Sequence, residues 1–296
     1  MNKREFAKYL QDKRRLVEDR LDRILPPESR PPRILHRAMR LSVLAPAKRV
    51  RPILCLSACR AVGGKEEAAI RSACALELIH TYSLIHDDLP SMDDADLRRG
   101  QPACHKAFGE AIAILAGDAL LALAFSLVAG DKLLSDRQCR RIVDELARAA
   151  GPAGMVGGQA KDLLAEGKKI NQAELVSLHA AKTGALITAA LLTGGISGDA
   201  GAEELEILRG YGEAIGLSFQ IRDDILDVTG EKKNLGKKTG RDLEAGKATF
   251  PGLFGLETSR RRLEELTARA RATISPLGPE AGPLCRLADF LAWRKS

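Results

Sequence analysis

Aromatic residues are scarce in this chain of 296 residues: Phe, Tyr and Trp together make up 4% of it, and there is a single Trp. Proteins that bind single-stranded nucleic acid stack the bases on aromatic side chains, so this scarcity argues against a nucleic-acid partner despite the net charge of +7. Residues of high helix propensity dominate, and no segment alternates between apolar and polar residues as a half-buried strand does. The sequence therefore predicts an all-α protein.

Cysteine motifs of redox or zinc proteins are also missing. The six cysteines form no CxxC pair and no Cys/His pattern with metal-ligand spacing; they are Cys55, Cys59, Cys74, Cys104, Cys139 and Cys285. Most of them lie in apolar helical segments, where a free cysteine packs like a small hydrophobic residue. We expect a reduced protein of the cytoplasm.

Long uninterrupted apolar segments are missing as well. The longest, such as ALLALAFSLVAG, fall short of the roughly 20 residues that cross a bilayer. The N-terminal segment MNKREFAKYLQDKRRL carries too many charges to resemble a secretory signal peptide. We therefore expect no stable insertion into a membrane.

Helical periodicity continues along the chain, and proline and glycine separate the periodic segments. The segment PPESRPP ends a first helix, and Gly63–Gly64 ends the helix that opens near Pro52. There is neither a long linker nor an internal repeat. The simplest organisation is one domain over residues 1–296, a bundle of about ten or more helices around a central cavity.

One segment concentrates acidic residues at the end of an apolar helix. Five aspartates lie within ten positions and two arginines follow at once; they are Asp87, Asp88, Asp93, Asp94 and Asp96, then Arg98 and Arg99. Two like charges about 4 Å apart repel by about 4 kcal/mol at an effective dielectric constant of ~20. A solvated surface loop is the plain interpretation. A hard divalent cation that also binds phosphate oxygens is the functional one.

A second acidic cluster favours the functional interpretation. The segment FQIRDDILD places Asp223 and Asp227 four residues apart, so both lie on one helix face, with Gln220 one turn earlier. Pro90 breaks the first helix, which allows Asp93 to fold back toward Asp87. Two facing acidic surfaces with basic residues beyond them predict a site for magnesium and a diphosphate.

Several basic residues lie where an anion could bind. Lys48 and Arg51 stand at a helix start, where backbone N–H groups favour anions, although lysine and arginine in turns are usually just solvated. His80 shares a helix face with Asp87, although a lone histidine is more often packed or solvated. Lys182 interrupts an apolar helix around Lys182–Gly184 and needs a partner, either a diphosphate or a carboxylate.

Five segments carry a resemblance to a known family: AKRVRP, HTYSLIHDDLPSMDDADLRRG, AAKTG, FQIRDDILD and GKKTGRDLEAGKATFP. Together they resemble the trans-isoprenyl diphosphate synthases, most closely the bacterial farnesyl diphosphate synthases. The resemblance implies the isoprenoid synthase fold and a prenyltransferase that joins isopentenyl diphosphate head to tail with dimethylallyl or geranyl diphosphate. It also implies a C15 product, three magnesium ions and a homodimer.

The resemblance also implies individual roles. The metal ligands would be Asp87, Asp93 and Asp223, with Asp88, Asp224 and Asp227 in support. The allylic diphosphate would contact Arg98, Lys182, Lys237 and Lys247. The diphosphate of isopentenyl diphosphate would contact Lys48, Arg51, His80 and Arg99. The reacting carbon would lie beside Lys182, Thr183 and Gln220. The sequence departs from the family pattern at Pro46-Ala47-Lys48, where the family usually has Gly-Gly-Lys. Because Lys237 and Lys238 are adjacent, either of them could be the lysine that contacts the allylic diphosphate.

The resemblance implies that Tyr82, five residues and about 7.5 Å before Asp87 on a helix, influences product length. By resemblance, an aromatic residue there stops growth at fifteen carbons; simple core packing is the alternative role. The first alternative function is therefore a geranylgeranyl diphosphate synthase with a C20 product. A non-catalytic subunit of a prenyl synthase is a more remote alternative. A terpene cyclase fits less well, since its second motif is normally of an Asn/Ser/Glu type.

Overall fold

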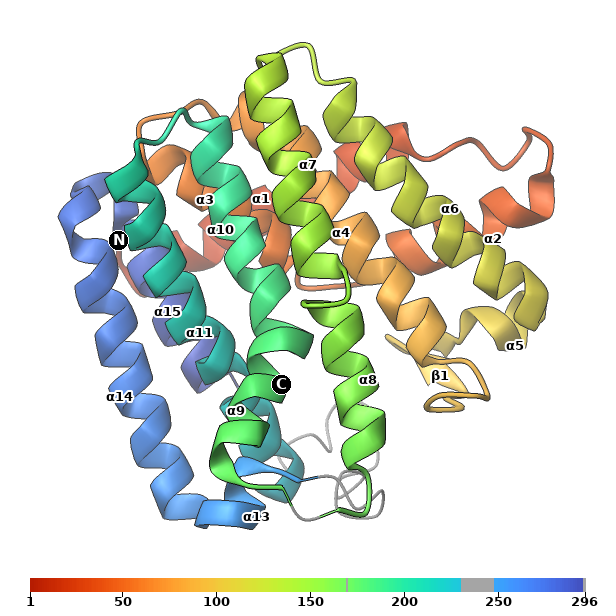
Figure 1. Cartoon of the computed structure of the whole chain (residues 1–296). Coiled ribbons are helices and arrows are strands. Elements are labelled where there is room, and N and C mark those ends of the chain that lie inside the picture. Colours follow the sequence, from red (N-terminus) through yellow and green to blue (C-terminus); the bar gives the residue numbers. More distant parts are fainter. Residues whose placement is uncertain (169, 230–247, 295–296) are drawn as a thin grey trace.

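The computed structural model describes residues 1–168, 170–229 and 248–294, and within these ranges it is an all-α bundle (Figure 1). The predicted fold class is confirmed. The helices of the first half are α1 (Lys3–Ile24), α2 (Arg33–Leu44), α3 (Val50–Ala61), α4 (Glu66–Asp87), α5 (Cys104–Phe108), α6 (Glu110–Ala129) and α7 (Asp136–Ala150). One short hairpin lies between α4 and α5 and pairs β1 (Leu97–Arg98) antiparallel with β2 (Gln101–Pro102).

The second half is also helical. It contains α8 (Met155–Ala165), α9 (Gln172–His179), a π-helical turn η1 (Ala180–Gly184), α10 (Ala185–Ser197), α11 (Ala202–Thr229), α13 (Phe250–Phe254), α14 (Leu256–Ile274), the 3-10 turns η3 (Ser275–Leu277) and η4 (Pro279–Ala281), and α15 (Gly282–Trp293). The predicted interruption of one long helix around Lys182 is confirmed, because η1 separates α9 from α10.

The core surrounds α4, which packs against α3, α6 and α10. Its middle turns are buried and mostly apolar: Leu76, Leu78 and Ile79 are fully buried, and the side chain of Glu77 is buried with them. Burying a side chain of this size contributes roughly 1.5–3 kcal/mol, so α4 is fixed from several directions at once. In Figure 1 the hairpin with β1 lies at the lower end of α4, and α8 and α9 extend to the same end of the bundle. The acidic end of α4 is therefore placed by a rigid helix.

Two helical segments are long and apolar enough, by length and composition alone, to cross a membrane: Glu110–Ala129 and Gln172–Ser197. The expectation that all apolar stretches are too short is therefore wrong for these two. In the apolar window of Gln172–Ser197, 61% of the residues are buried inside the protein, so packing in the core accounts for its composition. For Glu110–Ala129 the share is 39%, and Ile114 and Leu115 are exposed.

Candidate active site

The first acidic cluster folds back on itself as predicted. Helix α4 ends at Asp87, and the backbone N–H of Asp93 donates to the Asp87 carbonyl at 2.9 Å. The N–H of Ala95 likewise donates to the Asp88 carbonyl at 3.2 Å. Pro90 prevents the helix from continuing, and these bonds bring Asp93 back beside Asp87.

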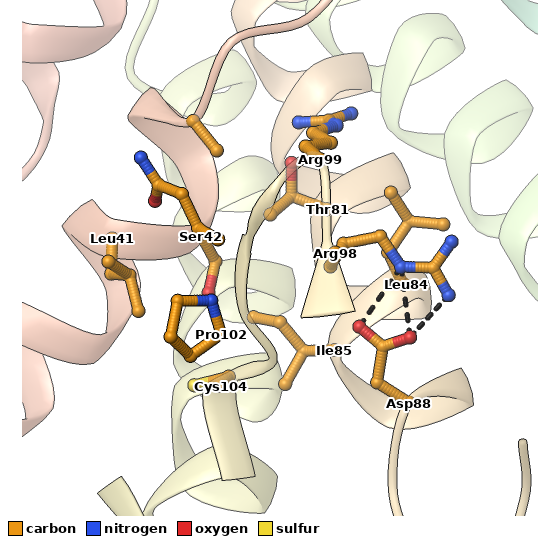
Figure 2. Close-up of a pocket in the computed structure, with 12 residues that line it drawn as sticks. Leu41, Ser42, Thr81, Leu84, Ile85, Asp88, Arg98, Arg99, Pro102 and Cys104 are labelled. Atoms are coloured by element: carbon orange, nitrogen blue, oxygen red, sulfur yellow. Dashed lines mark hydrogen bonds and ion pairs between the residues drawn. The ribbon is translucent and has the colours of Figure 1, made fainter. Parts of the chain in front are cut away.

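Asp87 and Asp88 are adjacent in sequence but differ in environment. Burial and the nearby carboxylates of Asp93 and Asp88 raise the pKa of Asp87 to about 6, although Lys182 and Arg98 oppose this shift. Asp88 is 1% exposed and accepts hydrogen bonds from Arg98 Nε at 2.9 and 3.0 Å (Figure 2). Asp88 therefore orients Arg98. Within the described ranges no arginine binds the Asp87 carboxylate in this bidentate way, so Asp87 is suited to a metal ion.

The β1–β2 hairpin presents the two arginines at the acidic end of α4. Arg99 has a left-handed backbone (φ 55°), and Gly100 follows with φ 77°. Both arginines line a cavity of about 20 Å³, which has room for about one water molecule. Figure 2 shows their side chains among the residues that line it. The hairpin turn thus directs both guanidinium groups toward α4, and Arg99 Nη2 lies 3.5 Å from Glu77 of that helix.

The second acidic cluster lies in the last turns of α11, and its members differ in exposure. The Asp223 side chain is 33% exposed and lies 2.8 Å from Arg294 Nη2. Asp227, which shares its helix face, is buried. Asp224 is buried too and accepts hydrogen bonds from Gln220 Nε2 at 3.0 Å and from the Phe250 N–H at 2.9 Å. Asp223 is thus the accessible ligand candidate, and Asp224 fastens α13 to α11.

The π-helical turn η1 brings Lys182 and Thr183 to the site. Two neighbouring helices approach η1 so closely that each needs a glycine at the contact. A Cβ on Gly158 of α8 would lie 2.2 Å from the backbone nitrogen of Lys182, and a Cβ on Gly216 of α11 would lie 2.8 Å from Gly184 Cα. Thr183 Oγ1 donates to Gln220 Oε1 at 2.9 Å. Thr183 and Gln220, both expected by resemblance beside the reacting carbon, are therefore in direct contact; their role there stays a prediction.

Lys182 has the carboxylate partner that its place in an apolar helix requires. Its Nζ lies 2.5 Å from Asp162 Oδ2 of α8, and its charge also lowers the pKa of Asp87. Asp162 was missed by sequence reasoning. The available signal was a lone acidic residue in α8, four positions after the Gly158 that allows α8 to approach η1.

The basic residues predicted to bind the second diphosphate form one cluster. Burial lowers the pKa of Arg51 to about 10, and burial beside Arg51 and Arg99 keeps the pKa of His80 well below its ordinary value. His80 is therefore neutral at physiological pH and is able to accept or donate. Partial burial and then Arg294 lower the pKa of Lys48, whereas Asp223 raises it. These couplings link the basic cluster to α11.

Two buried donors in this cluster have no hydrogen-bond partner in the described part of the chain: Arg51 Nε and Arg99 Nη1. A buried polar group without a partner costs about 1–3 kcal/mol, and more when it is charged. An anion that accepts from both guanidinium groups would recover this energy. The second observation that points to an anion is the depressed pKa of Arg51 itself, because a bound negative charge would reverse that shift.

Behind these arginines lies a buried ion pair that sequence reasoning also missed. Arg49, with a fully buried side chain, lies 2.7 Å from Glu77, and it donates to the carbonyls of Val43 and Ala45 at 2.8 and 3.0 Å. Glu77 thus joins Arg49 and Arg99 and supports the wall of the basic cluster.

The donor set fits magnesium rather than zinc. Among the described residues, no three His, Cys, Asp or Glu side chains converge into a protein cage for a metal ion. Magnesium is usually held by one or two carboxylates, with phosphate oxygens and water completing its octahedron. Asp87 and Asp93 in the first acidic cluster and Asp223 in the second are carboxylates of the type that such a site requires. Lys237 and Lys247, predicted to contact the allylic diphosphate, lie outside the described residues.

Comparison with known proteins identifies the family. The polyprenyl synthetase family model matches residues 32–276. Among curated relatives, the chloroplastic heterodimeric geranylgeranyl pyrophosphate synthase large subunit 1 of Arabidopsis thaliana is 46% identical over 99% of this chain and 80% of its own. Other relatives at similar identity are also named geranylgeranyl pyrophosphate synthases.

Solved structures agree with this family. A farnesyl/geranylfarnesyl (FPP/GFPP) synthase from Zymomonas mobilis superposes with a TM-score of 0.84 at 37% identity, covering 99% of this chain and 98% of the other. A geranylgeranyl pyrophosphate synthetase from Pyrococcus horikoshii superposes with a TM-score of 0.88 at 32% identity, covering 98% of both chains.

The chain belongs to the polyprenyl synthetase family, and it is a prenyltransferase of the trans-isoprenyl diphosphate synthase kind. The resemblance that the aspartate clusters carry is therefore confirmed.

Proposed function

We propose that this enzyme elongates prenyl chains by joining isopentenyl diphosphate to an allylic diphosphate such as dimethylallyl or geranyl diphosphate. The observation that carries the proposal is that acidic residues at the end of α4 accompany a partly buried cationic cluster, in which Arg51 Nε and Arg99 Nη1 have no hydrogen-bond partner among the described residues. The first feature suits a metal-bound diphosphate, and the second suits another diphosphate beside it. Family membership supports both substrates.

The reaction has three bond changes, and the residues serve each of them. The C–O bond of the allylic diphosphate breaks, and its electron pair leaves with the diphosphate, which Arg98 and Lys182 contact. The double bond of isopentenyl diphosphate, held by Lys48, Arg51, His80 and Arg99, forms the new C–C bond. The Thr183 and Gln220 oxygens stabilise positive charge on the reacting carbons, and the departed diphosphate takes the proton.

Magnesium would be held by Asp87, Asp93 and Asp223, and we propose three ions. When bound, it supplies the positive charge that stabilises the leaving diphosphate. The Lys182–Asp162 pair keeps the ammonium group beside Asp87 until an anion arrives. Buried apolar side chains around α4 exclude water that would quench the cation.

For the product, we infer a C20 chain, geranylgeranyl diphosphate. Relatives at 46–48% identity over nearly the whole chain carry that name, which favours it over the C15 product expected from the resemblance. Farnesyl diphosphate is the second candidate because of Tyr82. This residue is 6% exposed, lies in α4 one turn before His86, and packs edge-on against that ring at 5.7 Å between centroids.

The catalytic proposal is tested by replacing Asp87 with Asn. We expect kcat to fall by about 10²–10³-fold, since one preorganised electrostatic contact to the transition state is lost. The matched control is Asp94→Asn: Asp94 belongs to the same loop but is exposed and lies 3.2 Å from Lys106. Equal activity of the two variants would contradict the assigned site.

Product length is tested by chromatography of the dephosphorylated products of the wild-type enzyme and of Tyr82→Ala. A C20 product from the wild type supports the main proposal. A C15 product that lengthens in Tyr82→Ala supports the second candidate and overturns the first. The control is Tyr9→Ala: it removes the tyrosine of α1 whose hydroxyl lies 2.8 Å from Ser57 Oγ, and it should leave product length unchanged.

We also propose a homodimer through α6, because Ile114 and Leu115 expose apolar side chains there. Leu115→Glu should dissociate the dimer in analytical ultracentrifugation, whereas Leu253→Glu on α13, also an exposed leucine, should not. We place the enzyme in the cytoplasm; a plastid is the alternative suggested by the chloroplastic relatives, and imaging of the tagged full-length protein distinguishes the two.

A further inference from the structure

Arg294, the residue after α15, forms an ion pair with Asp223, the accessible member of the second acidic cluster. Its side chain is 4% exposed, and its Nη2 lies 2.8 Å from Asp223 Oδ1. The guanidinium also donates to the carbonyls of Leu291 at 3.1 Å and Phe219 at 3.2 Å, and its Cζ lies 3.7 Å from the centroid of the Phe219 ring. Four contacts therefore fix this arginine over Asp223.

The main chain of Arg294 is fixed as well. Arg222, on the helix that carries Asp223, donates to the Arg294 carbonyl from Nε at 2.9 Å and from Nη2 at 2.7 Å. A bidentate charged donor of this kind is stronger than a neutral hydrogen bond. Arg294 is thus held on α11 by its backbone and its side chain together, and several further contacts support its ion pair with Asp223.

Arg294 also belongs electrostatically to the basic cluster. It lowers the pKa of Lys48, whereas Asp223 raises it, so all three groups lie within interaction range of one another. Asp223 likewise raises the pKa of Arg51. The guanidinium that is paired with Asp223 is therefore also coupled to Lys48 of the proposed diphosphate site.

We propose that Arg294 is a built-in counter-ion of Asp223 which a divalent cation must displace, so that Arg294 weakens metal binding in the unloaded enzyme. This proposal rests on the proposed role of Asp223 as a metal ligand. A carboxylate paired with a buried guanidinium is already neutralised, and a divalent cation beside that guanidinium is repelled with little solvent screening.

The exchange couples metal binding to substrate binding. A diphosphate arriving at the basic cluster offers Arg294 another anion, which releases Asp223 for the metal ion. By linkage, the metal ion then tightens diphosphate binding by the same factor. Arg294 would thereby hinder cation binding at Asp223 until an anionic substrate is present.

The test measures Mn²⁺ binding without substrate, by counting free Mn²⁺ with electron paramagnetic resonance. Arg294→Gln should bind Mn²⁺ about fivefold or more tightly than the wild type, a factor at the low end of typical site-to-site coupling. A merely structural role predicts weaker binding instead. Arg294→Lys, which keeps the charge, should stay near the wild type. Arg271→Gln removes an equal charge from an exposed pair with Asp289 and should change nothing.

A second measurement needs no change at Arg294. The only tryptophan, Trp293, is its neighbour in sequence and is half exposed, so its fluorescence reports movement of the chain end. Mg²⁺ should change this emission in the wild type but not in Asp223→Asn. Unchanged or weakened Mn²⁺ binding by folded Arg294→Gln overturns the proposal, as does constant emission while Mg²⁺ saturates a site that Asp223→Asn abolishes. If Asp223→Asn binds metal like the wild type, the metal role of Asp223 fails as well, which separates the two failures.

Discussion

Replacing Glu77 with Gln tests how strongly the basic cluster depends on one buried carboxylate. Glu77 Oε1 lies 2.7 Å from Arg49 Nη1 and 3.5 Å from Arg99 Nη2. Glutamine keeps the shape but leaves the buried Arg49 with only the 37%-exposed Glu18 as a neighbouring carboxylate, and breaking a buried ion pair in this way costs about 3–5 kcal/mol. Arg49 keeps its bonds to the carbonyls of Val43 and Ala45, so we expect a loss of about 3 kcal/mol in the free energy of unfolding.

The assay is urea unfolding followed by circular dichroism at pH 7.5. The control is Glu18→Gln, because Glu18 lies 3.5 Å from the same arginine but is 37% exposed. An exposed pair is worth less than about 1 kcal/mol, so this variant should unfold nearly like the wild type. A loss below about 1 kcal/mol in Glu77→Gln, or equal losses in both variants, would refute the assignment of Glu77 as the anchor of the cluster.

Two further predictions concern the reacting groups. Because the pKa of Asp87 is raised to about 6, ionising this carboxyl destabilises the metal-free fold as pH rises from about 4 through 6. Asp87→Asn should therefore gain about 1–3 kcal/mol in the free energy of unfolding at pH 7.5, measured by urea titration, and the gain should shrink toward pH 4.5. No gain at pH 7.5 would contradict the burial of Asp87 among charges. Gly216→Ala should lose about 1–3 kcal/mol and lower kcat, because its Cβ would meet Gly184 Cα at 2.8 Å, whereas Gly210→Ala on the same helix meets only the Thr273 methyl group at 3.4 Å and should be neutral or slightly stabilising in the same assays.

The fold class and two local features of the candidate site followed from local sequence. The acidic cluster after Asp87 is compact in sequence, and Pro90 alone predicts the return of Asp93. The interruption at Lys182 was visible because a lysine inside an apolar helix needs a partner. Helix α7 also runs from Asp136 to Ala150 as predicted, since Ser135 and Gln138 form a capping box.

The missed residues act through distant contacts. Asp162 matters because α8 packs on η1, and Glu77 matters because α3 places Arg49 against α4. Arg294 lies 71 residues after Asp223, at the end of an amphipathic helix with no motif of its own. No local pattern announces such pairs, because the packing of separate helices creates them.

The prediction that every apolar segment is too short to cross a membrane also failed, because it considered only local sequence. That prediction considered uninterrupted apolar runs, whereas the helix Glu110–Ala129 includes Asp118 and glycine and still has the length and composition of a membrane span.

Tyr82 is a position where the sequence suggests a role that burial alone cannot assign. Its burial agrees with a chain-stopping role and equally with core packing, so this one position does not decide between the C15 and the C20 product.

The most direct test of the central claim is a single incubation series. Folded wild-type enzyme receives labelled isopentenyl diphosphate and geranyl diphosphate, with and without Mg²⁺, and the dephosphorylated products are sized. We predict label in a C20 alcohol only when Mg²⁺ is present. Failure to incorporate label with geranyl, dimethylallyl or farnesyl diphosphate at saturating Mg²⁺ would contradict the account.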